Sequence, residues 1–296
     1  MTADTASTAD TADTADTADA PDSGRAGAAP PRDRARGERG LTAQELLARL
    51  LIDPGLAEEL RAGPAGFARR HGVDPGVAEA LAAVPVPGMR LARGITRGKR
   101  QHRVVTSFPG TFALAAAAGE GAEDALIAAA LARPSLVGPA DLLAAGEELR
   151  RAAAGLPGGP TTDALREVAA FETLWYRAQV RAAGPAAAPG PPALRPGVVL
   201  AVFDRPVAEV QRLAVAGHPP EDLPTGVTHY LVRAEAGSTR VRSHRVSPVL
   251  AALLGACDGE RTAAGAAGQA GLEPAEAERA LRSMAAKAIL TWAPGT

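Results

Sequence analysis

The segment GPAAAPGPPALRPG, at residues 184–197, separates two parts of the chain with different secondary-structure patterns. Its prolines and glycines are incompatible with a continuous helix. Before this segment the apolar residues recur with helical spacing, and directly after it they follow the pattern of strands. The sequence therefore predicts an all-helical domain over residues 41–183, a linker over 184–197 and a second domain over 198–296.

Helix-start signals are frequent in the first domain. Thr42 with Glu45 has the spacing of a capping box. Asp53-Pro54, Pro64 and Asp74-Pro75 each place a proline where a helix can begin. Further helical periodicity predicts helices over residues 122–133, 139–154 and 161–183.

The second domain begins with strand-like segments. VVLAVF at 198–203 reads as a strand, and the segments 228–233 and 239–246 flank AEAGS as a hairpin. Three short helices are predicted at 248–256, 263–270 and 275–288, and residues 289–292 either form a last strand or pack on the last helix. The predicted fold is thus α+β, an N-terminal all-α domain followed by a winged helix-turn-helix domain with a β-hairpin or three-stranded sheet and three helices.

Composition restricts the function classes. The single cysteine excludes an intramolecular disulfide, and the net charge of −1 provides no overall attraction to nucleic acid or membranes. Residues 1–40 carry a TAD repeat and are expected to form a disordered, low-complexity tail. We found no secretory signal and no apolar run of about 20 residues, so a cytoplasmic location without membrane insertion is expected.

The stretch ACDGERT, at 256–262, gathers a thiol, two carboxylates and a guanidinium. Cys257 falls on the apolar face of the preceding predicted helix, with Val249, Leu250, Leu253 and Leu254. Asp258-Gly259 supplies a turn, and Thr262 is placed to cap the next helix. Because no histidine lies nearby in the sequence to activate the thiol, we interpret the stretch as a helix corner with a buried cysteine.

Two resemblances rest on particular motifs. LLGACDGERTAAGAA followed by PAEAERALRSMAAKAIL, within Thr228 to Trp292, resembles the small peptide chaperone of pyrroloquinoline quinone biosynthesis, a precursor-recognition fold of ribosomal peptide (RiPP) pathways. Upstream, MRLARG, KRQHRVV, FPGT (interpreted as a turn) and FETLWYRA occur in an order similar to that of partner proteins of multinuclear non-heme iron-dependent oxidative (MNIO) enzymes. This second resemblance spans about residues 41–296.

The resemblance implies a non-catalytic partner protein. Such a protein binds the leader of a ribosomal precursor peptide and presents it to a separate iron-dependent oxidative TIM-barrel enzyme. The iron belongs to that enzyme, so no cofactor, metal site or catalytic residue is expected in this chain. The five histidines are also scattered, without metal-ligand spacing.

In the resembled recognition fold, a peptide adds as a strand to the hairpin edge, beside the third helix. Carried onto this chain, the strand is Thr239–Val246, with Val241 on one face and Arg240, Arg242 and His244 on the other, and the helix is Ala275–Ala288. The apolar stripe of this helix is predicted to be Ala277, Leu281, Met284 and Ala288. The candidate peptide-binding residues are Thr239, Arg240, Val241, Arg242, His244, Arg279 and Arg282. The alternative is that these arginines only solubilise a face and protect a sheet edge from aggregation.

A second set of residues is predicted to dock the enzyme. The segment from Arg90 to Arg103 holds six Lys or Arg residues and no acid, and an aromatic pair lies in the last helix of the first domain. The candidate docking residues are Arg97, Lys99, Arg100, Arg103, Trp175 and Tyr176. For the basic segment the alternatives are a solvated face, contact with an acidic peptide and, last, contact with nucleic acid. For the aromatic pair the alternative is anchoring of the helical core.

Two other functions compete with the partner protein. A winged helix also reads DNA, but the predicted third helix mixes Glu273, Glu276 and Glu278 with Arg279, Arg282 and Lys287 and is a poor match to phosphates. An enzyme in its own right has no recognisable catalytic residues in this sequence.

Overall fold

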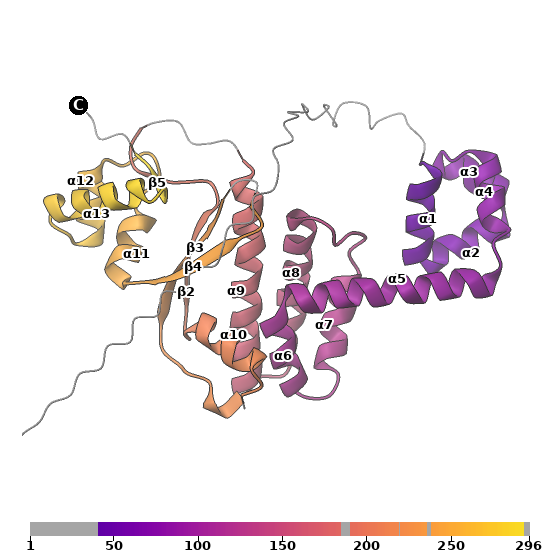
Figure 1. The fold of residues 1–296 in the computed structure, drawn as a ribbon, viewed down its shortest axis with the longest axis horizontal. Coiled ribbons are helices and arrows are strands. Elements are labelled where there is room, and N and C mark those ends of the chain that lie inside the picture. Colours follow the sequence, from indigo (N-terminus) through magenta and orange to yellow (C-terminus); the bar gives the residue numbers. More distant parts are fainter. Residues whose placement is uncertain (1–40, 185–189, 219, 236–237, 293–296) are drawn as a thin grey trace, which may run out of the picture.

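The computed structural model describes residues 41–184, 190–218, 220–235 and 238–292; the predicted tail at 1–40 lies outside them. The fold is α+β, mostly helical, with a small antiparallel sheet (Figure 1). The helices before the predicted linker are α1 (Ala43–Ile52), α2 (Pro54–Ala62), α3 (Pro64–His71), α4 (Pro75–Ala82), α5 (Val86–Ser107), α6 (Pro109–Ala117), α7 (Ala122–Leu131), α8 (Pro139–Ala154) and α9 (Pro160–Ala182).

Helices α1 to α4 form a small group with its own core. Their starts are those that the sequence predicts: the Thr42 hydroxyl accepts a hydrogen bond from the Glu45 N–H at 3.2 Å, and the Glu45 carboxylate accepts one from the Thr42 N–H at 3.0 Å. Asp53 and Asp74 cap α2 and α4. Buried apolar side chains including Leu46, Leu50, Leu60 and Phe67 fill the space between the helices.

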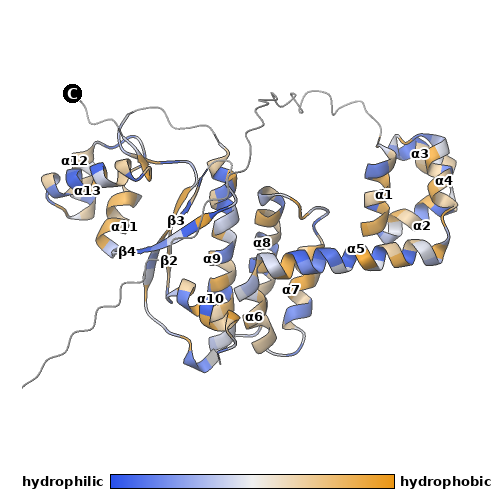
Figure 2. Ribbon diagram, viewed as in Figure 1, coloured by the Kyte–Doolittle hydropathy of each residue, from blue (hydrophilic) through white to orange (hydrophobic). Residues whose placement is uncertain are grey.

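Helix α5 connects this group to the helices in the centre of the molecule (Figure 1). Its buried residues, Met89, Val104 and Ser107, lie near its two ends. The segment between them is strongly hydrophilic, with exposed Leu91 and Ile95 as exceptions (Figure 2). The basic segment of the sequence therefore forms the middle of a 22-residue helix, where Arg90, Arg97, Lys99 and Arg103 are exposed and Arg93 and Arg100 are half-buried. Periodicity alone did not predict this helix.

Helices α6 to α9 build the largest core. Buried side chains from α5 to α9 and from α10 (Val207–Val215) meet there, including Phe108, Leu149, Leu165 and Val210. Helices α8 and α9 approach closely at Gly146, where an added Cβ would lie 2.6 Å from the Thr173 hydroxyl. Glycine at this position therefore permits the close packing of the two helices.

The carboxylate of Glu172, on α9, is fully buried at the N-terminus of α6. It accepts hydrogen bonds from the N–H groups of Gly110 and Thr111 at 2.8 and 3.1 Å, from the Thr111 hydroxyl at 2.6 Å and from the Gln211 amide at 2.7 Å. Thus the FPGT motif is the first turn of a helix and not the turn that the sequence suggested. Pro109 suits the first helical position, and Glu172 satisfies N–H groups that a helix start leaves open.

The second part of the chain starts inside the predicted linker. Residues Ala193–Leu194 of that segment form a short strand, β1, whose partner is β5 (Leu290–Thr291). The remaining elements are β2 (Val198–Phe203), α10, the 3₁₀ turn η1 (Pro220–Asp222), β3 (Thr228–Ala234), β4 (Val241–Val246), α11 (Pro248–Gly255), α12 (Ala263–Ala270) and α13 (Pro274–Ala286). The three predicted C-terminal helices are confirmed to within two residues at each end.

Strands β2, β3 and β4 form an antiparallel sheet in that order. One face packs on α9: Val199 and Val232 are cross-strand partners and share a buried cluster with Phe171. On the other face, Leu231 shares a cluster with Leu253 and Leu281 of the C-terminal helices. The sheet therefore lies between α9 and the three C-terminal helices (Figure 1).

Helix α10 was not predicted from the sequence. It contacts α6 and α9, and its Val210 and Ala214 belong to the large helical core. Through Gln211 it also reaches the buried Glu172. A segment that follows the predicted linker therefore completes the core of the first domain. Among the described residues, no helix has the length and apolarity needed to cross a bilayer.

Gly110→Ala should lower the free energy of unfolding by about 1–3 kcal/mol, because the added methyl group would overpack this point. An added Cβ would lie 2.4 Å from Gln211 Cγ and 2.8 Å from Val168 Cγ1. Gly98→Ala is the matched control: its Cβ meets no atom within 4 Å, so it should stabilise helix α5 by about 0.5–1 kcal/mol. Urea unfolding of both variants measures the difference, and equal effects would contradict the close approach.

Burial raises the pKa of Glu172, while its four hydrogen-bond donors oppose that shift. A carboxyl whose pKa is raised in the folded state binds more protons there than in the unfolded chain, so this group's contribution to stability falls as the pH rises above about 4.5. The stability difference between wild type and Glu172→Gln should therefore shrink from pH 4.5 towards neutral pH in urea unfolding. A difference that grows with pH would show that the donors outweigh burial.

Candidate functional site

Strand β4 is an edge of the three-stranded sheet. It pairs with β3 from Val241 to Val246, and no described strand pairs with its other side. In an antiparallel ladder, every second residue of an edge strand directs its N–H and C=O groups away from the sheet. β4 therefore offers main-chain donors and acceptors to another strand.

The two faces of β4 lie in different surroundings. Val241 packs against the cluster under α9, whereas Val246 packs against the cluster of the C-terminal helices. Since side chains alternate, Arg242 and His244 share the face of Val246, and Arg245 shares the face of Val241. Both arginines and His244 are exposed. This alternation is the one that the sequence predicted.

The predicted strand begins two residues too early. Thr239 and Arg240 precede β4 and lie in irregular backbone. The Gln179 side chain of α9 donates a hydrogen bond to the Thr239 carbonyl at 2.8 Å, and the Ser238 hydroxyl accepts one from the Arg240 N–H at 3.0 Å. The start of the candidate strand is thus held against α9 rather than paired with β3.

The edge carries an excess of positive charge. Arg240, Arg242 and Arg245 form no ion pair with any described residue. Arg242 also lies directly opposite Arg233 of β3, an arrangement of like charges that weakens a sheet. The Arg233 guanidinium forms an ion pair with Glu235 at 3.0 Å and donates a hydrogen bond to the Lys287 carbonyl at 2.7 Å, so within this pair of arginines it is Arg242 that lacks a described counter-charge.

Helix α13 lies on the same side of the sheet as Arg242 and His244, because its Leu281 belongs to the cluster that includes Val246. Arg279 and Arg282 are both exposed, and Arg282 forms an ion pair with Glu278 at 2.6 Å. The contacts of α13 are chiefly with α12 and β5.

The predicted apolar stripe of this helix is partly wrong. Ala277 and Leu281 are buried and Met284 is half-buried, but Ala288 lies beyond the helix end with a φ of 54°. The predicted apolar face of α11 needs a similar correction, since Val249 is 48% exposed. Both errors extend a periodic pattern to a position at a helix terminus.

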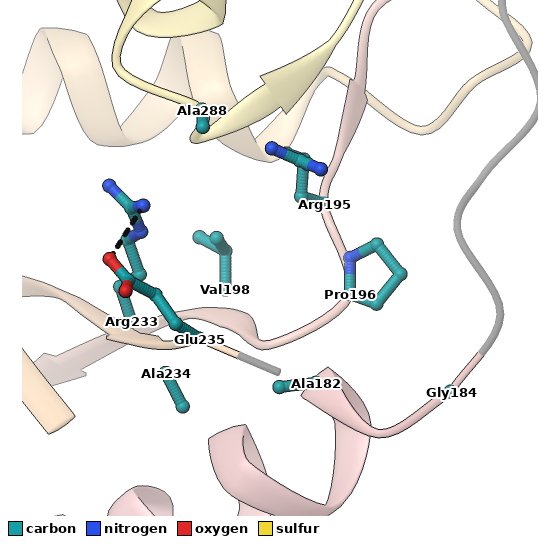
Figure 3. A pocket seen from close by; sticks show the side chains of 9 residues that line it. All are labelled: Ala182, Gly184, Arg195, Pro196, Val198, Arg233, Ala234, Glu235 and Ala288. Carbon is teal, nitrogen blue, oxygen red and sulfur yellow. Dashed lines mark hydrogen bonds and ion pairs between the residues drawn. The ribbon is translucent and has the colours of Figure 1, made fainter. Parts of the chain in front are cut away.

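A small cavity of about 230 Å³ opens near the end of β3 (Figure 3). Arg195 and Arg233 reach towards it from two segments, Val198 lies between them, and Ala182 of α9 and Ala288 form parts of its wall. Neither arginine was predicted from the sequence as a site residue. Arg233 interrupts an apolar strand, and this interruption was the available signal.

The enzyme-docking candidates on α5 differ in their surroundings. Arg100 donates hydrogen bonds to the carbonyls of Leu131 and Arg133, and Arg103 donates one to the Val137 carbonyl at 3.4 Å. Arg97 and Lys99 are exposed. Two of the four predicted cations therefore hold α5 against the end of α7 and the loop that follows it.

Trp175 and Tyr176 pack in two different clusters. Trp175 meets Phe171 edge-on, with ring centres 5.6 Å apart, beside the sheet. Tyr176 packs near Phe108, and its hydroxyl donates to the Ser107 carbonyl at 2.9 Å. Burial raises the pKa of Tyr176. Both side chains are half-buried, which matches the core-anchoring alternative more closely than a single exposed pair.

The ACDGERT stretch is the corner that the sequence predicted. The Asp258 carboxylate accepts hydrogen bonds from the N–H groups of Glu260 and Arg261, and the Thr262 hydroxyl accepts one from the Gly265 N–H at the start of α12. Gly259 has a φ of 85°. Cys257 is buried, and burial raises the pKa of its thiol to about 11.

Comparisons with known proteins do not assign this chain to a family. No protein-family model matches this chain, and the curated proteins contain no match to it. Within the described ranges, no three His, Cys, Asp or Glu side chains gather in a way that could hold a metal ion. The candidate site is therefore defined by the geometry and charge of β4 and its surroundings.

Cys257 should react slowly with thiol reagents at pH 8 while the protein is folded. A pKa of about 11 leaves about 0.1% thiolate, against roughly a quarter for an unperturbed cysteine. Reaction with a chromogenic disulfide should therefore be at least about 100-fold faster in urea than in buffer. Comparable rates would contradict the burial of Cys257.

Proposed function

We propose that this chain is a non-catalytic partner protein that binds the leader of a ribosomal precursor peptide and presents it to a separate iron-dependent oxidative enzyme. The observation that supports this most is the basic, unpaired edge of β4. The main-chain groups of β4 suit a peptide that adds as a strand, and Arg240, Arg242 and His244 suit acidic side chains on that peptide.

The proposed binding region extends to the C-terminal helices. Arg279 and Arg282 of α13 are exposed on the helical side of the sheet, towards which Arg242 also faces. We assign β2–β4 with α11–α13 to a winged-helix recognition domain. The sheet order, the three helices that follow it and the Thr262 cap at the start of α12 support this assignment.

The proposed enzyme-docking region is the first domain. Arg97 and Lys99 present unpaired charge on α5, beside Arg100 and Arg103. Trp175 and Tyr176 of α9, both half-buried against the core, complete the proposed docking set. In this proposal the TIM-barrel enzyme holds the iron, this chain holds no cofactor, and both act in the cytoplasm.

The competing function is a winged-helix transcription regulator. A recognition helix needs a positive surface against DNA phosphates. In α13 the Glu278 carboxylate is paired with Arg282, and Glu276 adds a further negative charge. This nearly balanced charge favours peptide recognition over DNA.

Arg242→Glu should weaken binding of a fluorescently labelled candidate precursor peptide, chosen from short reading frames near this chain's gene, by about tenfold in an anisotropy titration. Charge reversal removes an attraction of about 1 kcal/mol and adds a repulsion. Arg245→Glu is the matched control, because it lies on the same strand, is equally exposed and faces α9. Its effect should be clearly smaller.

The wild-type protein and these two variants also distinguish peptide binding from DNA binding. Equal losses for both variants would contradict the assigned binding face. If Arg242→Glu bound the peptide with unchanged affinity, β4 would not be part of the peptide-binding site. Absence of peptide binding and of co-purification with the iron enzyme, together with salt-dependent retention on duplex DNA, would support the regulator instead.

A further inference from the structure

A groove of about 560 Å³ runs beside α5, between α1 and α7. We call it the arginine groove; it is lined by Leu51 and Ile52 of α1, Leu131 of α7, and Arg93, Arg97 and Arg100 of α5. Its walls are apolar on two sides and carry three guanidinium groups on the third. Such a lining suits an anionic segment with small, partly apolar side chains.

The guanidinium groups in this groove have unsatisfied donors. Arg93 uses Nε to donate to the Leu50 carbonyl at 2.9 Å, but its buried Nη2 has no partner among the described residues. Arg100 donates through Nη2, while its buried Nε lacks an acceptor in the same part of the chain. A buried donor without an acceptor is costly, so these atoms favour a bound anion.

No acid in the described part of the chain neutralises these charges. None of the described ion pairs includes Arg93, Arg97 or Arg100. The acid closest in sequence to the groove-lining residues of α1, Asp53, uses its carboxylate to cap α2 through the N–H groups of Gly55 and Leu56. Burial lowers the pKa of Arg100, as expected for a desolvated cation without a counter-charge.

The sequence of this chain supplies a complementary segment. Residues 1–24 contain six aspartates and no Lys, Arg or Glu, and most of their other residues are Thr and Ala. The segment precedes α1, whose last residues line the groove. Residues 23–40 could span up to about 60 Å when extended, several times the roughly 15 Å length of α1. Tethering also raises the local concentration of such a segment to about the millimolar range.

We propose that the acidic N-terminal repeat of this chain, residues 4–22, binds the arginine groove on α5 of the same molecule. The aspartates supply acceptors for the unsatisfied guanidinium groups, and the Ala and Thr side chains fit between Leu51 and Leu131. The repeat then covers Arg97 and Arg100 and competes with any acidic partner for them. The contact does not depend on the proposed function, because it needs neither precursor peptide nor enzyme.

The test uses the full chain with Ala15→Cys and a nitroxide label on the new cysteine. Cys257 is buried and its pKa is about 11, so the label should attach selectively to position 15. Paramagnetic broadening should be several-fold stronger at the amides of Gly94 and Gly98 than at those of β4. It should disappear in 1 M salt, where the screening length falls from about 10 Å to about 3 Å.

Three variants make the test specific. Replacing Asp4, Asp10, Asp13, Asp16, Asp19 and Asp22 by Asn should abolish the broadening of α5, and Arg97→Glu should reduce it at least by half. Arg245→Glu, an equally exposed arginine on β4, should leave it unchanged. Absence of broadening on α5, its persistence in the Asn variant, or broadening centred on β4 and removed by Arg245→Glu would each overturn the proposal.

Discussion

The buried carboxylate of Glu172 connects the parts of this fold. It lies on α9, satisfies the N–H groups at the start of α6 and accepts a hydrogen bond from Gln211 of α10. A buried charge is tolerated only where several donors surround it, and here those donors come from two other helices, α6 and α10. The position of α10 against the helical core is therefore fixed by a polar contact as well as by Val210. Because α9 also packs under β2 and β3, the sheet is held at a defined place on the helical part.

This arrangement explains which features were predictable from sequence. Local signals, such as the Thr42 capping box, the Asp-Pro helix starts and the Asp258-Gly259 corner, act within a few residues, and the structure confirms them. Helix α6 and helix α10 depend on partners far away in the chain: the Gly110 N–H needs Glu172, 62 residues later, and α10 needs its contacts with α6 and α9. The FPGT and FETLWYRA motifs were noticed separately, but only the fold shows that they form one contact.

For the candidate site, alternation along β4 was predictable because strand geometry imposes a period of two. The contacts of Arg233 were not predictable. Its position opposite Arg242 depends on how β3 and β4 pair, and its hydrogen bond to the Lys287 carbonyl depends on where α13 ends. The same limit applies to α5. Charge alone groups Arg97, Lys99, Arg100 and Arg103, but the structure separates Arg100 and Arg103, which bind backbone carbonyls, from the exposed Arg97 and Lys99.

The two basic regions, the edge strand β4 and the arginine groove on α5, lie on different elements of the fold and suit different ligands. β4 offers a row of main-chain donors and acceptors, so it binds a peptide in an extended conformation. Its arginines add a weaker preference for acidic side chains on that peptide. The arginine groove offers side-chain donors and apolar walls but no free strand edge. It therefore suits a negatively charged segment with small side chains, and the backbone conformation of that segment matters little. One chain with these two surfaces can hold an extended peptide at the sheet while a second acidic segment occupies α5. The two surfaces therefore differ in what they suit: the edge of β4 suits an extended peptide, and the groove on α5 suits an acidic segment such as the N-terminal repeat.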